Sequence, residues 1–314
     1  MKLSFSTILS GLFLPLALFT VSCNRQPSAK SVEASFRALR AVEHLSDPQK
    51  VARWMKPWSE MPRSSLQFSP NSIISGGDTL LILPKSAVDI AYTRKSNGIQ
   101  GSFTISAGPR DDQPAITRFF LDFRGGENDR WTGTSDWAKE AASSLDSLKV
   151  YFTKPEKMYG YPIQPITVTD TAFLFSSRTI QKSEFPQASS ALFEMLIREA
   201  AKKGVTYTGV RIFNFEEMSP DRLTIYAGVG IDRPVQTGEQ DSVRFKWMPY
   251  GHNLLAVDFE GPYGEVRKIN EALEQYRVDN QRVIMAIPFH KYLSDGYGYT
   301  DSQVVKIRAC LPVY

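Results

Sequence analysis

The 314-residue chain carries 37 basic and 33 acidic side chains, a formal net charge of +4, and 42% hydrophobic residues. This excess of positive charge is small and its basic residues are scattered, so we expect no nucleic-acid partner. The chain has only two cysteines, Cys23 and Cys310. Because Cys23 stands in an N-terminal leader, no intrachain disulfide is expected, and Cys310 is predicted to be a buried, inert thiol.

The N-terminal leader predicts where the protein is located. Lys2 precedes an apolar run, Leu9 to Val21, that is short for a membrane span. Thr20-Val21-Ser22-Cys23 is typical of a bacterial lipobox, in which the thiol becomes acylated. We therefore expect a signal peptide over residues 1–23, lipidation at Cys23, and attachment to the periplasmic side of a membrane. The alternative is an ordinary secretory signal, and the choice between inner and outer membrane stays open.

The mature chain is long enough for two domains. Residues 24–31 are polar and predict a tether, followed by domains at 32–151 and 158–314. Tyr151 to Pro165 contains three prolines and a glycine and predicts the linker between them.

Strand patterns dominate the first domain. Val32 to Val42 is charged and looks more helical than extended, whereas Ser96-Asn97-Gly98 predicts a hairpin turn. Asp136 to Leu148 predicts an amphipathic helix that Ser135 or Asp136 can cap. The predicted strands are Thr79–Pro84, Val88–Thr93, Ile99–Ala107 and Ala115–Phe123.

This order of antiparallel strands closed by a long helix resembles a helix-grip domain of the START and polyketide-cyclase type. Trp54-Met-Lys-Pro-Trp58 also looks like the aromatic stretch of that family. The resemblance makes four aromatics candidates for a pocket wall, although core packing is favoured for each: Trp54, Trp58, Phe119 and Trp131.

The second domain repeats one strand-helix-strand-strand unit twice. The first copy is predicted at Ile166–Phe175, Pro186–Lys203 (helix), Gly209–Phe215 and Arg222–Ile231. The second copy is predicted at His252–Phe259, Tyr263–Asp279 (helix), Gln281–Tyr292 and Gln303–Val313. The predicted fold class is α+β. Two such units leave a groove between them, where a ligand would bind.

Two stretches resemble the gyrase-inhibitor-like (GyrI-like) small-molecule-binding domain. They are Met248 to Tyr263, which holds a Gly-Pro-Tyr corner, and the chain end Ile307 to Tyr314. The resemblance implies a small hydrophobic ligand between the two modules. In that family a glutamate on the penultimate strand faces a cationic ligand, and His290 stands in its place here. A register shift of one residue would put Lys291 there instead.

An imidazole supplies no fixed negative charge, so the sequence favours neutral or mildly anionic ligands over cations. A local hydrogen bond is the structural alternative for His290. Core packing is likewise the alternative for the aromatic candidates, and Trp247 is expected at the rim. The predicted ligand-binding residues are His290, Tyr263, Tyr292, Phe213, Phe215, Tyr226 and Trp247.

No cofactor or metal is expected, because His44, His252 and His290 lack a metal-ligand pattern. The favoured function is binding of a small hydrophobic molecule. One alternative is a hydrolase that uses Tyr263 and His290 as acid or base. Another is a structural envelope protein with closed pockets. An open aromatic groove would favour the first, an open groove with a hydrogen-bonded polar pair the second, and a packed groove the third. Oligomeric state stays open.

Overall fold

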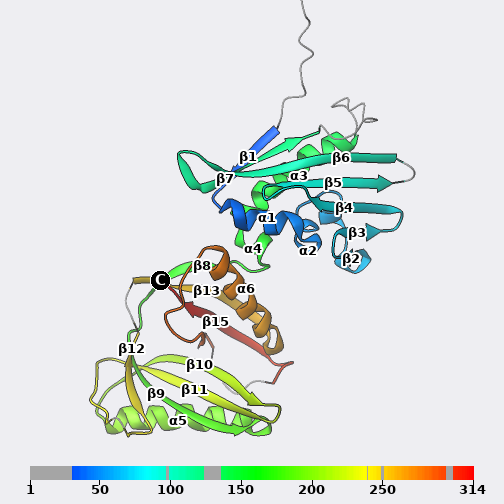
Figure 1. Cartoon of the computed structure of the whole chain (residues 1–314). Coiled ribbons are helices and arrows are strands. Elements are labelled where there is room, and N and C mark those ends of the chain that lie inside the picture. The colour runs from blue at the N-terminus through cyan, green and yellow to red at the C-terminus, as the bar shows by residue number, and fades with distance from the viewer. Residues whose placement is uncertain (1–29, 97–98, 124–135, 239, 249–250, 295–299) are drawn as a thin grey trace, which may run out of the picture.

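The computed structural model describes residues 30–96, 99–123, 136–238, 240–248, 251–294 and 300–314. Cys23, Trp131 and most of the predicted tether lie outside them. The described chain is α+β and forms two antiparallel sheets (Figure 1).

The first sheet has the order β1-β7-β6-β5-β4-β3-β2. Its strands are β1 (Lys30–Ala34), β2 (Gln67–Ser69), β3 (Ser72–Ser75), β4 (Asp78–Pro84), β5 (Asp89–Ser96), β6 (Ile99–Arg110) and β7 (Gln113–Asp122). Its helices are α1 (Ala38–Ser46), α2 (Pro48–Val51), α3 (Asp136–Thr153) and α4 (Pro155–Met158). Two short 3-10 helices lie at Trp58–Glu60 and Arg63–Ser65.

Within Val32 to Val42, which was expected to be helical, the helix begins only at Ala38, and the chain enters the first sheet as a strand. β1 pairs with β7 along its whole length, and it starts at Lys30, inside the predicted tether. Its charged residues form ion pairs: Lys30 with Asp146 of α3, and Glu33 with Arg118 of β7. These pairs let a charged segment serve as an edge strand.

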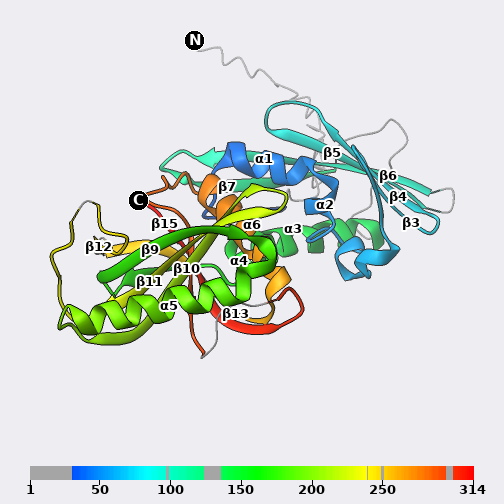
Figure 2. The ribbon, with the colours of Figure 1, turned by 90° about the horizontal axis from the view of Figure 1, so that it is seen from below.

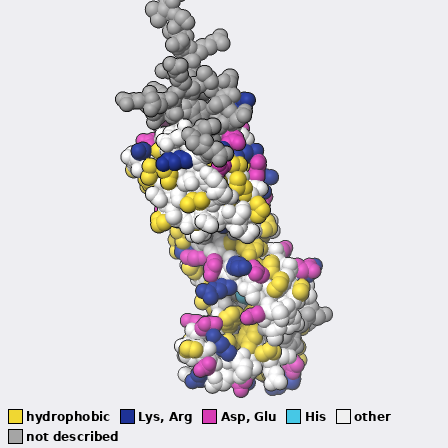
Figure 3. Space-filling model, turned by 90° about the vertical axis from the view of Figure 1, so that its right-hand side faces the viewer, with side chains coloured by type: hydrophobic (Ala, Val, Ile, Leu, Met, Phe, Trp, Pro, Cys, Tyr) yellow, Lys and Arg dark blue, Asp and Glu magenta, His cyan; other side chains and the backbone are white. Residues whose placement is uncertain are grey.

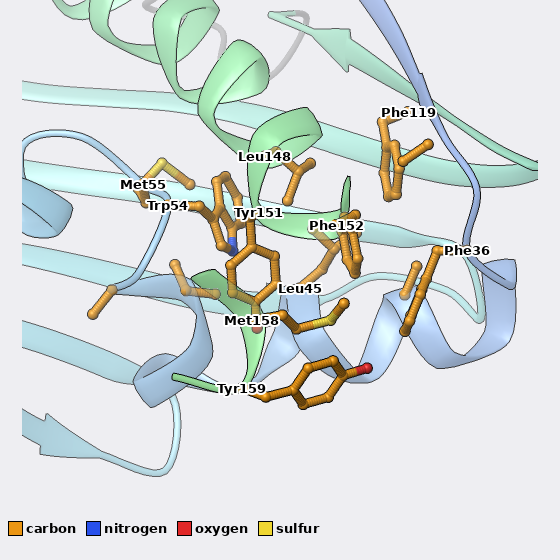
Figure 4. Packing of buried hydrophobic residues seen from close by; sticks show 14 of the residues in the cluster. Phe36, Leu45, Trp54, Met55, Phe119, Leu148, Tyr151, Phe152, Met158 and Tyr159 are labelled. Carbon is orange, nitrogen blue, oxygen red and sulfur yellow. The ribbon is translucent and has the colours of Figure 1, made fainter. Parts of the chain in front are cut away.

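Aromatic rings fill the core between the first sheet and its helices. α1 and α3 pack against the sheet, and Phe152 near the end of α3 lies beside Phe36 and Phe119 (Figure 4). Phe119 stacks on Phe152 with ring centroids 5.1 Å apart. Trp54 and Trp58 are also buried. These tryptophans and Phe119 are therefore core residues, as the packing alternative predicts.

The second sheet has the order β12-β9-β11-β10-β14-β15-β13-β8. The order is symmetric about its centre, so that β9, β11 and β10 on one side correspond to β13, β15 and β14 on the other. Its strands are β8 (Gln164–Val168), β9 (Ala172–Gln181), β10 (Tyr207–Ser219), β11 (Arg222–Ile231), β12 (Arg244–Trp247), β13 (Gly251–Pro262), β14 (Phe289–Tyr292) and β15 (Val304–Pro312). Its helices are α5 (Phe185–Lys202) and α6 (Val266–Asp279), each preceded by a 3-10 turn at Lys182–Glu184 or Tyr263–Glu265. α5 covers β9 to β11, and α6 lies between the two sheets (Figures 1 and 2).

Two predicted strands differ from the structure. The strand expected over Ile166 to Phe175 is broken at residues 169–171 into β8 and β9, which pair with β13 and β11 respectively. Of the strand expected over Gln281 to Tyr292, only Phe289 to Tyr292 is extended in the sheet. The break after β8 places Asp170 in the connection between β8 and β9, beside the sheet.

The predicted linker, Tyr151 to Pro165, is packed rather than free. Tyr151 ends α3, while Met158 and Tyr159 are buried in one continuous core. That core also contains Ile269 of α6 and Leu311 of β15. The domain boundary near residue 158 stays a prediction, but the residues on its two sides stabilise each other.

A buried carboxylate joins the two parts of the chain. Asp279, at the end of α6, accepts hydrogen bonds from Arg40 Nη2 (2.7 Å), Gln275 Nε2 (2.9 Å), His44 Nε2 (3.1 Å) and the Tyr159 hydroxyl (3.1 Å). Burial alone would raise the pKa of Asp279, but these hydrogen bonds outweigh it and hold the pKa below its usual value. Burial lowers the pKa of His44, so the imidazole is neutral at neutral pH and donates from Nε2.

On the face shown in Figure 3, acidic and basic side chains are interspersed over the described surface. Within the described ranges, no helix is both long and apolar enough to cross a membrane.

Candidate ligand-binding groove

The two faces of the second sheet differ in what covers them. One face packs against α5 and α6. On the other face, one row of neighbouring residues crosses five strands without a helix over it: Arg308, Lys291, Ile212, Gly228 and Phe175. Side chains alternate between faces along a strand, so residues next to this row in the sequence point toward the helices. The row forms the floor of a groove.

A glycine shapes this floor. Gly228 lies on β11 between Ile212 of β10 and Phe175 of β9. A Cβ atom at Gly228 would lie 2.9 Å from Ile212 Cγ1, so any side chain there would displace Ile212 into the groove. Gly228 therefore leaves room for the Ile212 side chain in the floor of the groove.

The main pocket of the groove is a cavity of about 160 Å³. Strands from both halves of the sheet line it, because the sheet curls around it. Its wall is largely apolar and aromatic: Phe173, Phe175, Ile212, Tyr226, Trp247, Met248, Leu254, Ile287 and Phe289. Trp247 stands at its rim with 56% of its surface exposed. Lys246 Nζ lies 4.2 Å from the centre of the Phe175 ring, a cation–π contact at the same rim.

A second pocket of about 120 Å³ adjoins the first and shares part of its wall. It contains the polar end of the groove. Lys291 Nζ binds Asp170 Oδ2 at 2.6 Å, and both side chains line this pocket. Arg308 also lines it and forms two hydrogen bonds with Asp258, of 2.5 and 2.8 Å.

Three of the predicted ligand-binding residues touch the groove. Tyr226 lines the main pocket from the uncovered face, which it shares with Gly228 on the same strand. Trp247 lines the pocket from the end of β12, where it pairs with Ala172. Phe213 also contacts the pocket, but its ring packs with Phe185 and Phe193 of α5, with centroids 5.7 and 6.0 Å apart. Phe213 is therefore mainly a core residue.

His290 does not fit its predicted place in the groove. It follows Phe289 and precedes Lys291, both of which line the pockets, so alternation turns its ring toward the helices. It is only 3% exposed, and its Nε2 lies 3.4 Å from Asn270 Oδ1 of α6. Burial lowers the pKa of His290 to about 4, so its imidazole is uncharged at neutral pH.

Tyr263, Tyr292 and Phe215 also pack on the helix-covered side. The ring of Tyr263 meets His290 edge-on at 6.5 Å, and that of Tyr292 meets Phe193 at 5.7 Å. Phe215 contacts Phe185 in the same core. The structure therefore gathers four predicted site residues, His290 among them, into a core cluster beneath the helices rather than into the groove.

The groove residues that the sequence prediction missed include Phe173, Phe175, Met248 and Phe289, and Lys291 was named only as the register alternative to His290. Along Phe289-His-Lys-Tyr292 the side chains alternate between the two faces of the sheet. The sequence alone does not show which face the helices cover. The register alternative that places Lys291 in the groove agrees with the structure. Cys310, as expected, is buried, which raises the pKa of its thiol to about 12.

In the described part of the chain, no cluster of His, Cys, Asp or Glu side chains is arranged to hold a metal ion. The groove offers rings, aliphatic side chains and one paired carboxylate. Its chemistry is therefore suited to holding a ligand by apolar contact with few polar anchors.

No protein-family model and no curated protein sequence matches this chain. Among solved structures, the C-terminal domain of EcmrR is 16% identical, with a TM-score of 0.35, over 49% of this chain and 98% of that one. EcmrR in its DNA complex is 17% identical with a TM-score of 0.36, and the match covers 49% of this chain and 57% of EcmrR. The di-domain ARO/CYC StfQ from the steffimycin biosynthetic pathway is 9% identical with a TM-score of 0.24, over 91% of this chain and 84% of StfQ.

These structures are similar to this chain only at a coarse level. Their TM-scores lie below 0.5, so the functional inferences below come from the residues of this chain.

Proposed function

We propose that this chain binds a small, flat, hydrophobic molecule in the groove of the second sheet. The observation that supports this most strongly is the open aromatic pocket of about 160 Å³ on the helix-free face. Burying apolar ligand surface there would supply roughly 25 cal/mol per Å². Since the wall is formed by strands of one continuous sheet, it is largely preformed, and little ordering would be lost on binding.

The size of the pocket sets the size of the ligand. An engineered apolar cavity of about 150 Å³ in another protein holds one benzene molecule. The main pocket has about this volume, and the adjoining pocket adds about 120 Å³. A molecule of about two or three fused or linked rings therefore matches the groove.

Neither alternative function finds equal support. The hydrolase alternative needs Tyr263 and His290 beside the ligand, but both side chains are buried on the opposite, helix-covered face. The structural alternative needs a packed groove, whereas this groove is open at the rim formed by Trp247. Small-molecule binding therefore remains the function that the geometry supports best.

Fluorescence titration with the neutral dye N-phenyl-1-naphthylamine tests this proposal. The wild type should bind the dye saturably, and Tyr226→Ala should weaken binding about tenfold, because one aromatic wall of the pocket is lost. Phe120→Ala is the matched control, since Phe120 is a partly exposed ring on β7 of the first sheet. Equal losses in both variants, or no saturable binding, would refute the proposal.

We also propose that the protein acts at a membrane of the cell envelope, held there through a lipid on Cys23. The Thr20-Val21-Ser22-Cys23 pattern supports this. The wild type should partition into the detergent phase, and Cys23→Ser should lose that partitioning. Mass spectrometry that finds an unmodified N-terminus beyond Cys23 would refute the anchor.

A further inference from the structure

Lys291 and Asp170 meet across the polar end of the groove. Lys291 stands on β14, one of the two central strands of the sheet, and Asp170 lies in the turn after β8 at the sheet's edge. The 2.6 Å contact between Lys291 Nζ and Asp170 Oδ2 therefore joins two opposite sides of the groove. Their side chains are 25% and 32% exposed, so both remain accessible from the pocket.

Asp170 is the sole carboxylate among the described residues that line the two pockets. The aromatic rings of the groove attract a cation only modestly, so a carboxylate is the strongest partner that the groove can offer to offset the cost of desolvating a cationic ligand. In this chain the ammonium group of Lys291 already pairs with Asp170. This ammonium group is attached to the protein, so it competes with any free cation at a high effective concentration.

We propose that Lys291 is a specificity-determining residue: its ammonium group neutralises Asp170 and thereby excludes cationic ligands from the groove. This inference rests on the proposed binding function and narrows its ligand class to molecules without a positive charge. Neutral and anionic molecules lose nothing through the Lys291–Asp170 pair, because they need no carboxylate. The selectivity follows from a residue that repels the wrong ligand and not from added contacts to the right one.

The test uses Lys291→Met in the full chain and a matched dye pair. Methionine keeps the unbranched apolar stem of lysine and removes its charge. The probes are N-phenyl-1-naphthylamine and the same dye carrying a trimethylammonium group. In the variant, affinity for the cationic dye should rise about tenfold, because Asp170 loses its internal partner. Affinity for the neutral dye should change by about twofold or less, which also shows that the groove is folded.

Lys306→Met is the matched control. It removes the same charge from the same sheet and breaks an ion pair with Glu260, but Lys306 lines neither pocket. Its effect on the cationic dye should be about twofold at most, from the change in net charge alone. An equal gain in both variants would show that general charge, and not release of Asp170, governs selectivity, and the proposal would be wrong.

A second variant separates the two partners. Adding Asp170→Asn to Lys291→Met should abolish the gain in cationic-dye affinity. If Lys291→Met binds the neutral dye normally but gains no affinity for the cationic dye, this inference fails and the proposed function stands. If the wild type binds neither dye, the proposed function itself fails, and the inference fails with it.

Discussion

Two carboxylates in the second half of the chain, Asp279 and Asp170, have contrasting environments. The Asp279 side chain has no exposed surface and is hydrogen-bonded by four other side chains from separate parts of the chain. The Asp170 side chain is about one-third exposed, and its charged partner is one flexible lysine. The first carboxylate is held entirely by the protein, whereas the second faces a groove in which another molecule could replace its partner.

The two carboxylates therefore have different roles: one stabilises the fold, and the other can influence binding. A buried carboxylate with all its acceptor positions occupied fixes the position of α6 against α1 and α4, but it offers nothing to a ligand. A carboxylate at the wall of an apolar pocket influences which ligand enters. We therefore expect substitutions at Asp279 to change stability, and substitutions around Asp170 to change binding.

The largest expected effect is at Asp279. Asp279→Asn should lower the free energy of unfolding by about 3 kcal/mol, because it removes the buried counter-charge of the Arg40 guanidinium, whose other carboxylate partner, Glu43, is about half exposed. Asp170→Asn is the matched control and should cost less than about 1 kcal/mol, since that ion pair is partly solvated. Urea unfolding of both variants measures the difference. Equal losses would contradict the distinction between the two sites.

The next effect concerns His290, which lies beside Lys291 in the sequence but on the closed face. Its pKa is about 4 in the folded chain and 6.5 in the unfolded reference state. Below pH 6.5 the unfolded state gains a proton that the folded state does not bind. Stability should therefore be fully retained above pH 6.5 and fall by up to about 3 kcal/mol toward pH 4.

Comparison with His290→Gln isolates this contribution from those of His44 and Asp279. The difference in unfolding free energy between wild type and variant should shift against the wild type as the pH falls from 7 to 4. A difference that stays constant over this range would mean that His290 is solvated, and its placement beneath the helices would be wrong.

His290 and Lys291, which are neighbours in the sequence, show how much of the site can be predicted from the sequence. The motifs around the Gly-Pro-Tyr corner and β14 predict a strand close to the groove, and two of the predicted site residues, Tyr226 and Trp247, line its main pocket. Alternation then leaves His290 and Lys291 as equal candidates for the groove. Only the position of α6, set by long-range packing, decides which face is covered.

The first half of the chain shows the same limit. The strands β4 to β7 and the helix α3 follow from local patterns, and their predicted positions are close to those observed. β1 was missed because its charged residues are satisfied by partners far along the chain, such as Asp146. The stretch from Tyr151 to Pro165 resembles a linker by its prolines, yet Tyr159 is buried against Tyr276 and Asp279. Such contacts have no local signature.

The smallest expected effect is at the rim of the groove. Trp247→Ala should weaken binding of the neutral dye about fivefold, since the exposed ring can cover only part of the ligand. Stability should change by less than about 0.5 kcal/mol, as is usual for exposed positions. Tyr292→Ala should lower the free energy of unfolding and leave dye binding nearly unchanged, because Tyr292 packs in the core with Phe193. Dye titration and urea unfolding of both variants measure these effects. A loss of stability in Trp247→Ala with normal stability in Tyr292→Ala would contradict the two placements.

The most direct test of the account is where a ligand binds on the second sheet. Isoleucine methyl groups can be labelled and followed by NMR while N-phenyl-1-naphthylamine is added. Ile212 and Ile287 line the groove, whereas Ile225 and Ile307 are buried on the helix-covered face. The account predicts saturable shifts of the Ile212 and Ile287 methyl signals, with Ile225 and Ile307 nearly unchanged. Shifts confined to Ile225 and Ile307 would place the ligand beneath the helices and contradict the groove as the binding site.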